Sequence, residues 1–368
     1  MGYEEKNEII ENDEIQKGNI NNTIYPKGLE NNYIYKKTKI GGYYSNYSYD
    51  IVSGNNCYIN SSIQCLFHLK KFTDNITKLV NDKSGNLMKA TSNLIEEMKI
   101  PNSKSSDEIS VKEIKREMAK IDERYKDNNQ EDANEFISNF LDGLLDETGD
   151  KSSFPEPLKM NNQQDQIAYN KFYDRFYKKR GNSFLLDLFY SIIKTQKVCK
   201  SCGKVISIKF NAYNIIELPI YNLAENNKDD LKFRDILADF MKKNENIIGE
   251  CKYCKAKNNI YEIIKIYKLP KYLMFYFGRK INGQYIDNDI IYPIKLEMTQ
   301  FLTDNEIKNT KYLITGVIHY SKFAKKEGHY TASCLYDDDI WYHFNDSIVT
   351  KEEEPNSYKN PIILIYKN

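Results

Sequence analysis

The residues of this chain best suited to nucleophilic chemistry are one cysteine and a small set of histidines. Cys57 follows a glycine and two asparagines and precedes an apolar segment with helical spacing, so we expect a helix to begin at or just after it. At a helix N-terminus, unpaired backbone N–H groups and the helix dipole favour the reactive thiolate. The alternative is a small buried core residue, because free cysteine is among the most buried residue types.

A cysteine nucleophile needs a base, and the chain has only four histidines. His68 lies on the expected Cys57 helix, roughly 16 Å away at about 1.5 Å per residue, which is too far to take the thiol proton. The other three, His319, His329 and His343, lie near the C-terminus. One of these three is therefore expected to act as the base.

Residues 328–350 have the pattern of a β-hairpin, with two strands flanking an acidic turn at 337–339. Paired residue numbers in a hairpin have a constant sum, here about 675, which places His329 opposite Asn345 or Asp346 to within about a residue. A histidine that meets an Asn or Asp side chain in this way satisfies the geometry of a Cys-His-Asn triad. His319, at a strand end before a polar loop, is the alternative base.

Two CxxC pairs predict a metal site. Cys199 and Cys202 form the first pair, and Cys251 and Cys254 form the second, each between strand-like segments. Four thiolates satisfy a tetrahedral Zn²⁺ ion at about 2.3 Å and leave no open position for substrate. We therefore expect one structural zinc ion per chain. The alternative is four unrelated surface cysteines.

Composition excludes several other classes of function. Lys and Arg total 53 against 52 Asp and Glu, and they form no long basic run, so nothing indicates a nucleic-acid partner. The hydrophilic N-terminus and the strand-length apolar runs give no sign of a membrane segment. We expect a cytoplasmic or nuclear protein that is monomeric.

The patterns along the chain predict an α+β fold. Residues 1–45 are polar and lack a sustained period, which indicates a flexible extension. The alternative is that short apolar stretches such as 33–35 dock on the domain. Helical spacing follows from residue 57 to about 149, including 87–98, 111–121 and 129–145. Residues 150–170 are expected to be a loop or an insertion. A period near two then predicts strands at 192–198, 205–210, 215–220, 260–267, 273–277, 312–320, 330–336, 340–344 and 362–366, with a short helix at 233–241.

These motifs resemble those of the ubiquitin-specific proteases, the papain-like cysteine deubiquitinases. GNNCYINSSIQCL (54–66) is similar to the family's Cys box, QEDANEFISNFLD (130–142) to its Q-x-D-A-x-E-F helix, and GHYTA with WYHFNDSIV (328–332 and 341–349) to its His box. The paired CxxC motifs and LPKYLMFYFGR (269–279) follow in the family's order. The resemblance implies a right-hand architecture in residues 46–367, with a helical thumb (about 46–185), zinc-ribbon fingers (about 186–270) and a β-rich palm (about 271–367).

The resemblance also implies roles for individual residues. Cys57 would be the nucleophile, His329 the base and then the acid, and Asn345 the residue that orients His329, with Asp346 as a second candidate. Asp132 and Glu135 would face the arginines of the ubiquitin tail, because carboxylates pair with guanidinium groups. The alternative is that both are solvated helix charges. Tyr330 would form part of the wall of the narrow channel that takes the Gly-Gly end of ubiquitin.

One departure from the family pattern concerns the oxyanion. The family's Cys box begins with Leu-x-Asn-Leu, and its Asn, five residues before the cysteine, donates to the oxyanion. Val52 holds that position here, and loss of one such donor costs about 10²–10³ in rate in other enzymes. Asn55, Asn56 and Ser53 are the candidate replacements.

The sequence therefore predicts a deubiquitinase that cleaves after the C-terminal glycine of ubiquitin. Two alternatives remain open. One is a ubiquitin-binding scaffold with weak catalysis, favoured by Val52, and the other is a protease for another ubiquitin-like modifier.

Overall fold

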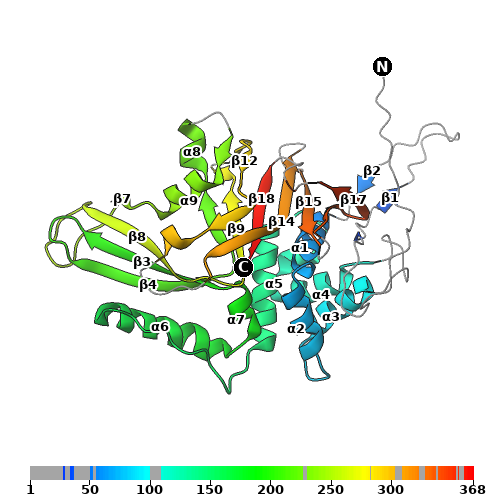
Figure 1. Cartoon of the computed structure of the whole chain (residues 1–368), viewed down its shortest axis with the longest axis horizontal. Helices are drawn as coiled ribbons and strands as arrows, with labels where there is room; N and C mark the ends of the chain where they lie inside the picture. Colours follow the sequence, from blue (N-terminus) through cyan, green and yellow to red (C-terminus); the bar gives the residue numbers. More distant parts are fainter. Residues whose placement is uncertain are drawn as a thin grey trace.

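The computed structural model covers the whole chain and describes residues 28–29, 34–36, 50–52, 55–99, 109–226, 230–281, 283–302, 309–322, 328–336, 339–353, 355 and 360–368. Figure 1 shows an elongated molecule in which helices pack beside a large sheet while a narrower sheet projects to one end. This mixture of helices and sheets confirms the α+β class. In the described part, no helix is long and apolar enough to cross a membrane.

Helices dominate the first half of the chain: α1 (Cys57–Phe67), α2 (Lys70–Leu79), α3 (Asn86–Lys99), α4 (Lys112–Ile121), the 3₁₀ helix η3 (Glu123–Lys126) and α5 (Ala133–Thr148). They agree with the helices expected from the apolar spacing. Every residue of α1 is buried, because α5 packs on one side of it and strands β14 and β15 pack on the other. The helix that carries Cys57 is thus enclosed in the core of the molecule.

An eight-stranded sheet lies against α1. Its strand order is β17 (Ile348–Glu352), β16 (Trp341–Asn345), β15 (Gly328–Leu335), β14 (Lys311–Lys322), β18 (Pro361–Lys367), β9 (Tyr272–Gly278) and β5 (Ile216–Pro219), with β13 (Lys295–Glu297) also paired to β14. The pairs are antiparallel except β5 with β9. A second apolar core, which includes residues of α9 (Phe233–Met241), also packs against strands of this sheet. Strand β17 was not expected from the sequence.

The projecting sheet has the order β4 (Val205–Tyr213), β3 (Ser191–Cys199), β8 (Ile260–Lys268) and β7 (Asn244–Ile247). Helix α6 (Gln163–Arg180) lies along it (Figure 1). The loop expected at 150–170 is therefore wrong from residue 163 onward. The side chain of Asn162 caps this helix, and an aromatic stripe including Tyr169 and Phe172 provides its buried face.

Short elements complete the described chain: β1 (Ile34–Lys36), β2 (Asp50–Val52), α7 (Phe184–Phe189), α8 (Tyr221–Asn226), β6 (Leu231–Lys232), β10 (Lys280–Ile281), β11 (Gln284–Tyr285), β12 (Ile290–Ile291) and η4 (Thr299–Phe301). Of the extension expected at 1–45, the structure describes only 28–29 and 34–36. Leu29 is fully buried against the helical part, and β1 pairs with β2. Leu29 therefore belongs to the folded domain.

A buried ion pair fastens α6 to the projecting sheet. Asp165 of α6 and Lys194 of β3 are joined at 2.6 Å, with about one-twentieth of each side chain exposed (5% and 6%). We expect Asp165→Ala to lower the free energy of unfolding by about 3–5 kcal/mol, because it leaves a buried ammonium without its partner. Chemical denaturation measures this cost. Asp174→Ala removes an exposed ion pair to Lys178 on the same helix and is the control, expected to cost under about 1 kcal/mol. Equal effects of the two variants would contradict the prediction.

Candidate active site

Cys57 is the first residue of α1, as expected. Its side chain is only 2% exposed, so the thiol sits in a largely desolvated position at the positive end of the helix. Asn56 precedes the helix without forming a side-chain cap. The thiol thus lies at the N-terminal end of a helix that is enclosed by the fold.

The His329–Asn345 hairpin has the expected arrangement. Strands β15 and β16 pair with Ala332 opposite Phe344, which places the register within one residue of the predicted sum. His329 Nε2 lies 2.6 Å from Asn345 Oδ1 and 3.9 Å from Asp346 Oδ2. A carboxamide oxygen and a carboxylate therefore both face one ring nitrogen, which fixes the orientation of the ring.

The electrostatic surroundings of His329 connect it to Cys57. Burial alone would lower its pKa, but the hydrogen bond to Cys57, the charge of Cys57, the hydrogen bond to Asn345 and the charge of Asp346 outweigh burial and raise the pKa to about 9. The imidazolium form is therefore favoured at neutral pH. The geometry brings Cys57, His329 and Asn345 together in one site.

Asp346 links this hairpin to the helix of the nucleophile. It lies in the two-residue turn between β16 and β17 with φ of +53°, a left-handed conformation that Asp tolerates better than most residues. Its Oδ1 accepts a hydrogen bond of 2.8 Å from Asn60 Nδ2, one turn after Cys57 on α1. The second candidate orienting residue is thus held by the nucleophile helix itself.

The other histidines occupy different surroundings. His319 Nε2 lies 3.1 Å from Ser333 Oγ, which in turn lies 3.2 Å from His343 Nδ1, and all three residues are buried. Burial lowers the pKa of His343 to about 4, and it does the same for His68. The geometry therefore favours His329 over His319 as the base.

The candidate oxyanion donors are arranged around Lys115. Asn55 Nδ2 donates to the Asn128 carbonyl at 2.8 Å, and Lys115 Nζ donates to Asn56 Oδ1 at 3.0 Å and to Asn128 Oδ1 at 3.2 Å. Since an ammonium has no acceptor, Lys115 fixes the carboxamide oxygen of Asn56 toward itself. Ser53 lies outside the described residues.

Gln130 is a site residue to which the sequence analysis gave no role. Its Nε2 is 3.5 Å from Cys57 Sγ and also donates to the carbonyl of Gly328, the residue before His329. One carboxamide thus joins the nucleophile to the strand of the histidine. The sequence did contain a signal for Gln130, because this residue opens the Q-x-D-A-x-E-F motif. The motif alone does not show which atoms the side chain contacts.

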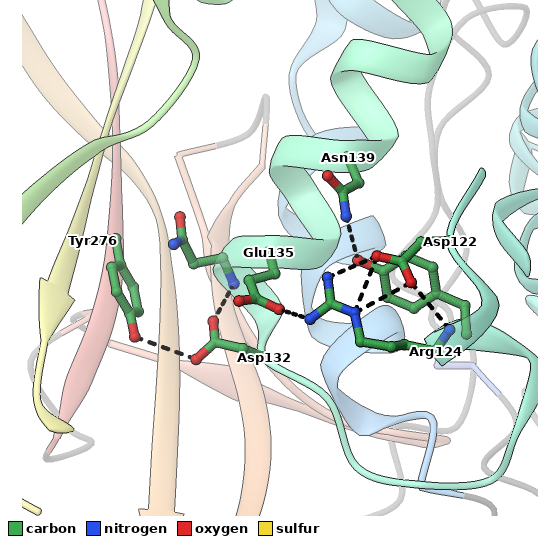
Figure 2. A network of polar contacts seen from close by, with 8 residues as sticks. Asp122, Arg124, Asp132, Glu135, Asn139 and Tyr276 are labelled. Atoms are coloured by element: carbon green, nitrogen blue, oxygen red, sulfur yellow. Dashed lines mark hydrogen bonds and ion pairs between the residues drawn. The ribbon is translucent and has the colours of Figure 1, made fainter. Parts of the chain in front are cut away.

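Asp132 and Glu135 both have partners within the chain (Figure 2). Asp132 caps α5 by accepting from Asn134 N at 2.8 Å, and it accepts from Tyr276 OH at 3.2 Å. Burial raises the pKa of the Asp132 carboxyl. Asp132 is thus a helix cap in contact with β9 rather than a solvated charge.

Glu135 forms an ion pair with Arg124, which also binds Asp122 through Nε and Nη2 (Figure 2). Arg124 and Glu135 are each about half exposed (47% and 49%), so a ligand can reach this pair. Tyr330 is buried beside Tyr320, with ring centroids 4.7 Å apart. Gln130, Asp132 and Glu135 lie close together in the sequence, and Gln130 is the one that contacts Cys57.

The four CxxC cysteines converge as expected at the tips of two hairpins. Their Sγ atoms all lie within 4.8 Å of one another, with Cys199 to Cys254 at 3.6 Å and Cys202 to Cys251 at 3.8 Å. A tetrahedron with Zn–S bonds of about 2.3 Å has edges of about 3.8 Å, which these separations match. In the described part of the chain, no other group of three or more His, Cys, Asp or Glu residues is gathered in this way.

Comparison with known proteins places this site in a family. The sequence model described as "Ubiquitin carboxyl-terminal hydrolase" matches residues 51–366. This chain therefore belongs to the ubiquitin carboxyl-terminal hydrolase family, in its ubiquitin-specific protease branch.

Among its relatives, Ubiquitin carboxyl-terminal hydrolase Usp2 of Drosophila melanogaster is 27% identical over 322 residues, covering 81% of this chain and 32% of that protein. Ubiquitin carboxyl-terminal hydrolase 2 of Rattus norvegicus is 27% identical over 316 residues, covering 81% of this chain and 50% of that protein. The chain thus spans about a third to a half of the length of these relatives.

A solved structure shares the fold. The SAGA Ubp8/Sgf11/Sus1/Sgf73 DUB module bound to ubiquitin aldehyde matches with a TM-score of 0.64 at 19% identity, over 96% of this chain and 71% of that one. This structural match confirms the predicted right-hand architecture, with its helical thumb, β-rich palm and projecting fingers.

Proposed function

We propose that this chain is a cysteine deubiquitinase that hydrolyses the isopeptide or peptide bond after the C-terminal glycine of ubiquitin. The observation that carries the proposal is the joint position of Cys57, His329 and Asn345 in a chain of this family. The names of its relatives and the ubiquitin aldehyde bound to its structural neighbour support ubiquitin as the partner. We expect the protein to act as a monomer in the cytoplasm, the nucleus or both.

In the proposed reaction, Cys57 Sγ attacks the carbonyl carbon of the terminal glycine and the C–N bond breaks. His329 gives its proton to the leaving amine, which leaves a thioester on Cys57. Neutral His329 then takes a proton from water, and the resulting hydroxide attacks the thioester, which releases the ubiquitin carboxyl group and regenerates the Cys57 thiolate beside protonated His329. The protonated form of His329 that the first step requires is the form its surroundings favour.

Asn345 would orient His329, and Asp346 would stabilise the imidazolium from 3.9 Å. Gln130 would keep the thiol and the histidine strand in register, since its carboxamide contacts both. Asp132, Glu135 and Tyr330 would line the path of the ubiquitin tail away from Cys57. The four clustered cysteines would hold one structural Zn²⁺, which supplies no step of the reaction because all four of its positions are filled by protein.

A ubiquitin C-terminal fluorophore amide tests the function. The full chain is expected to release the fluorophore, and Cys57→Ala is expected to release none. Tight binding of ubiquitin without release would instead support the scaffold alternative, and release only from another Gly-Gly modifier would identify a different substrate.

The pKa of His329 predicts the alkaline limit of activity. Because this pKa is raised from its ordinary value of about 6.5 to about 9, the imidazolium is present below that pH and is lost as pH rises through about 9. We expect kcat/KM to fall above about pH 9. Asn345→Ala removes one of the contacts that raise the pKa, so its alkaline limb is expected at lower pH. A pH–rate profile measures both, and an unmoved limb in the variant would contradict the assignment of Asn345.

Arg124 is expected to compete with the arginines of the ubiquitin tail for the carboxylate of Glu135. Its guanidinium already occupies the carboxylate that the tail arginines would need. We expect Arg124→Gln to lower KM for ubiquitin about two- to five-fold, in the range that exposed ion pairs contribute. Lys126→Gln removes an exposed charge from the same 3₁₀ helix and is the control, expected to leave KM near its original value. A higher KM for Arg124→Gln would show that Arg124 instead holds Glu135 in place.

A further inference from the structure

Gln130 reaches the reacting sulfur from outside the nucleophile helix. It lies three residues before α5 and is partly buried. Its Nε2 lies 3.5 Å from Cys57 Sγ and also donates to the carbonyl of Gly328. Because a carbonyl oxygen only accepts hydrogen bonds, the nitrogen of the carboxamide must be the atom that faces Gly328. The same NH₂ group therefore also faces Cys57.

The NH₂ group of a carboxamide has two N–H donors, which point in different directions. In Gln130, one donor goes to the carbonyl of Gly328, and the other is directed at Cys57 Sγ. Gly328 begins β15, the strand that carries His329. The second donor is therefore held in place beside the sulfur by the strand of the catalytic histidine.

The oxyanion of the proposed reaction forms close to this donor. As the bond from Cys57 Sγ to the glycine carbonyl carbon forms, the π electron pair of that carbonyl moves onto its oxygen, which lies two bonds from the sulfur. Donors that are already in place around this oxygen lower the barrier. The side chain of Cys57 is only 2% exposed, so protein groups must supply these donors in place of bulk water.

The backbone of Cys57 can supply one donor, because the first N–H groups of a helix have no acceptor within it. The carboxamides that precede Cys57 are directed at other groups. Asn55 Nδ2 donates to the carbonyl of Asn128, and Asn56 Oδ1 accepts from Lys115. Val52 is apolar and has no side-chain donor. Gln130, in contrast, donates to the reacting sulfur itself.

We propose that Gln130 is a catalytic residue whose second N–H donates to the oxyanion, both when the thioester forms and when water attacks it. The oxygen carries more negative charge in the transition state than in the substrate, so this hydrogen bond strengthens as the barrier is crossed. When the electron pair returns to the carbonyl, the C–N bond breaks and His329 protonates the amine, while Gln130 keeps its own protons. The inference rests on the proposed function and adds a residue to its mechanism.

Turnover of a ubiquitin–fluorophore amide by variants of the full chain tests this proposal. Gln130→Ala and Gln130→Met, the second of which keeps the length of the side chain, both remove the donor. Each is expected to lower kcat by about 10²–10³-fold with KM close to its original value. Asn129→Ala removes the exposed carboxamide one residue earlier and is the control, expected to keep kcat within about twofold. An unchanged kcat in both Gln130 variants would overturn the proposal.

Alkylation of Cys57 by iodoacetamide separates an effect on the oxyanion from an effect on the thiolate. This displacement forms a carbon–sulfur bond and expels iodide, and it places no charge on oxygen. Gln130→Met is therefore expected to be alkylated at Cys57 within about threefold of the original rate, and to melt near the original temperature. A loss of alkylation rate as large as the loss of kcat would show that Gln130 only positions the thiolate, and would overturn the proposal.

The original chain distinguishes failure of this inference from failure of the proposed function. If the original chain releases no fluorophore, the proposed function fails and this inference fails with it. If the original chain releases fluorophore and both Gln130 variants do so at the same rate, only this inference fails.

Discussion

Replacement of His329 by alanine is expected to lower kcat/KM by about 10⁴- to 10⁶-fold, as loss of a member of a catalytic triad does in other enzymes. The reason is that His329 pairs with Cys57 and, in the proposed reaction, delivers the proton to the leaving amine, whereas His319 and His343 each contact Ser333. Stopped or discontinuous assays of ubiquitin–fluorophore hydrolysis cover this range. Binding of ubiquitin should be retained.

His319 supplies the matched control for that experiment. It lies on the neighbouring strand and was the alternative base, but its ring contacts Ser333. His319→Asn is expected to cost no more than a few-fold in kcat/KM, with any larger loss accompanied by a lower melting temperature. Loss of activity from a stably folded His319 variant, with activity kept in His329→Ala, would reverse the assignment of the base.

Removal of zinc is expected to have the largest effect on stability. Structural zinc sites contribute apparent binding free energies of about 10–16 kcal/mol in small zinc-finger peptides, and the cysteine cluster joins the ends of all four strands of the projecting sheet. We expect one Zn²⁺ per purified chain, and we expect Cys254→Ser to lose zinc and to melt at a markedly lower temperature. Metal analysis and calorimetry measure the two effects.

Cys334→Ser tests whether the loss of any buried thiol would also lower the zinc content and the melting temperature. Cys334 is buried beside Cys65, with 3.6 Å between their Sγ atoms, and lies outside the CxxC cluster. Its variant is expected to keep one zinc ion per chain whatever its stability. A metal-free chain with a fully cooperative melting transition would contradict the structural role of zinc.

Much of this fold could be predicted from local sequence patterns, because these patterns reflect interactions between residues that are close together in the chain. The apolar spacing after Cys57 and within 129–145 predicted helices α1 and α5 to within a few residues. The constant sum of paired residues in a hairpin predicted that His329 lies close to Asn345 or Asp346, and both are near its ring. The CxxC spacing likewise predicted the cysteine cluster.

The missed features depend on contacts between distant segments. Helix α6 was missed because its aromatic stripe is set among many polar residues, and its buried face becomes meaningful only against the projecting sheet. The contact of Gln130 with Cys57 joins residues 73 positions apart, and the pairing of Arg124 with Glu135 joins η3 to α5. The burial of Leu29 is the clearest case, because the surrounding sequence is polar although Leu29 is fully buried and its backbone N–H donates to the Asp346 carbonyl.

Covalent labelling by ubiquitin-like proteins that carry a C-terminal electrophile tests the central claim most directly. The full chain is treated with a panel of Gly-Gly modifiers, and the labelled residue is located by peptide mass. The proposed function predicts labelling by the ubiquitin probe at Cys57, with no labelling of Cys57→Ala. Failure of the ubiquitin probe to label the original chain, or equal labelling of Cys57→Ala, would contradict it.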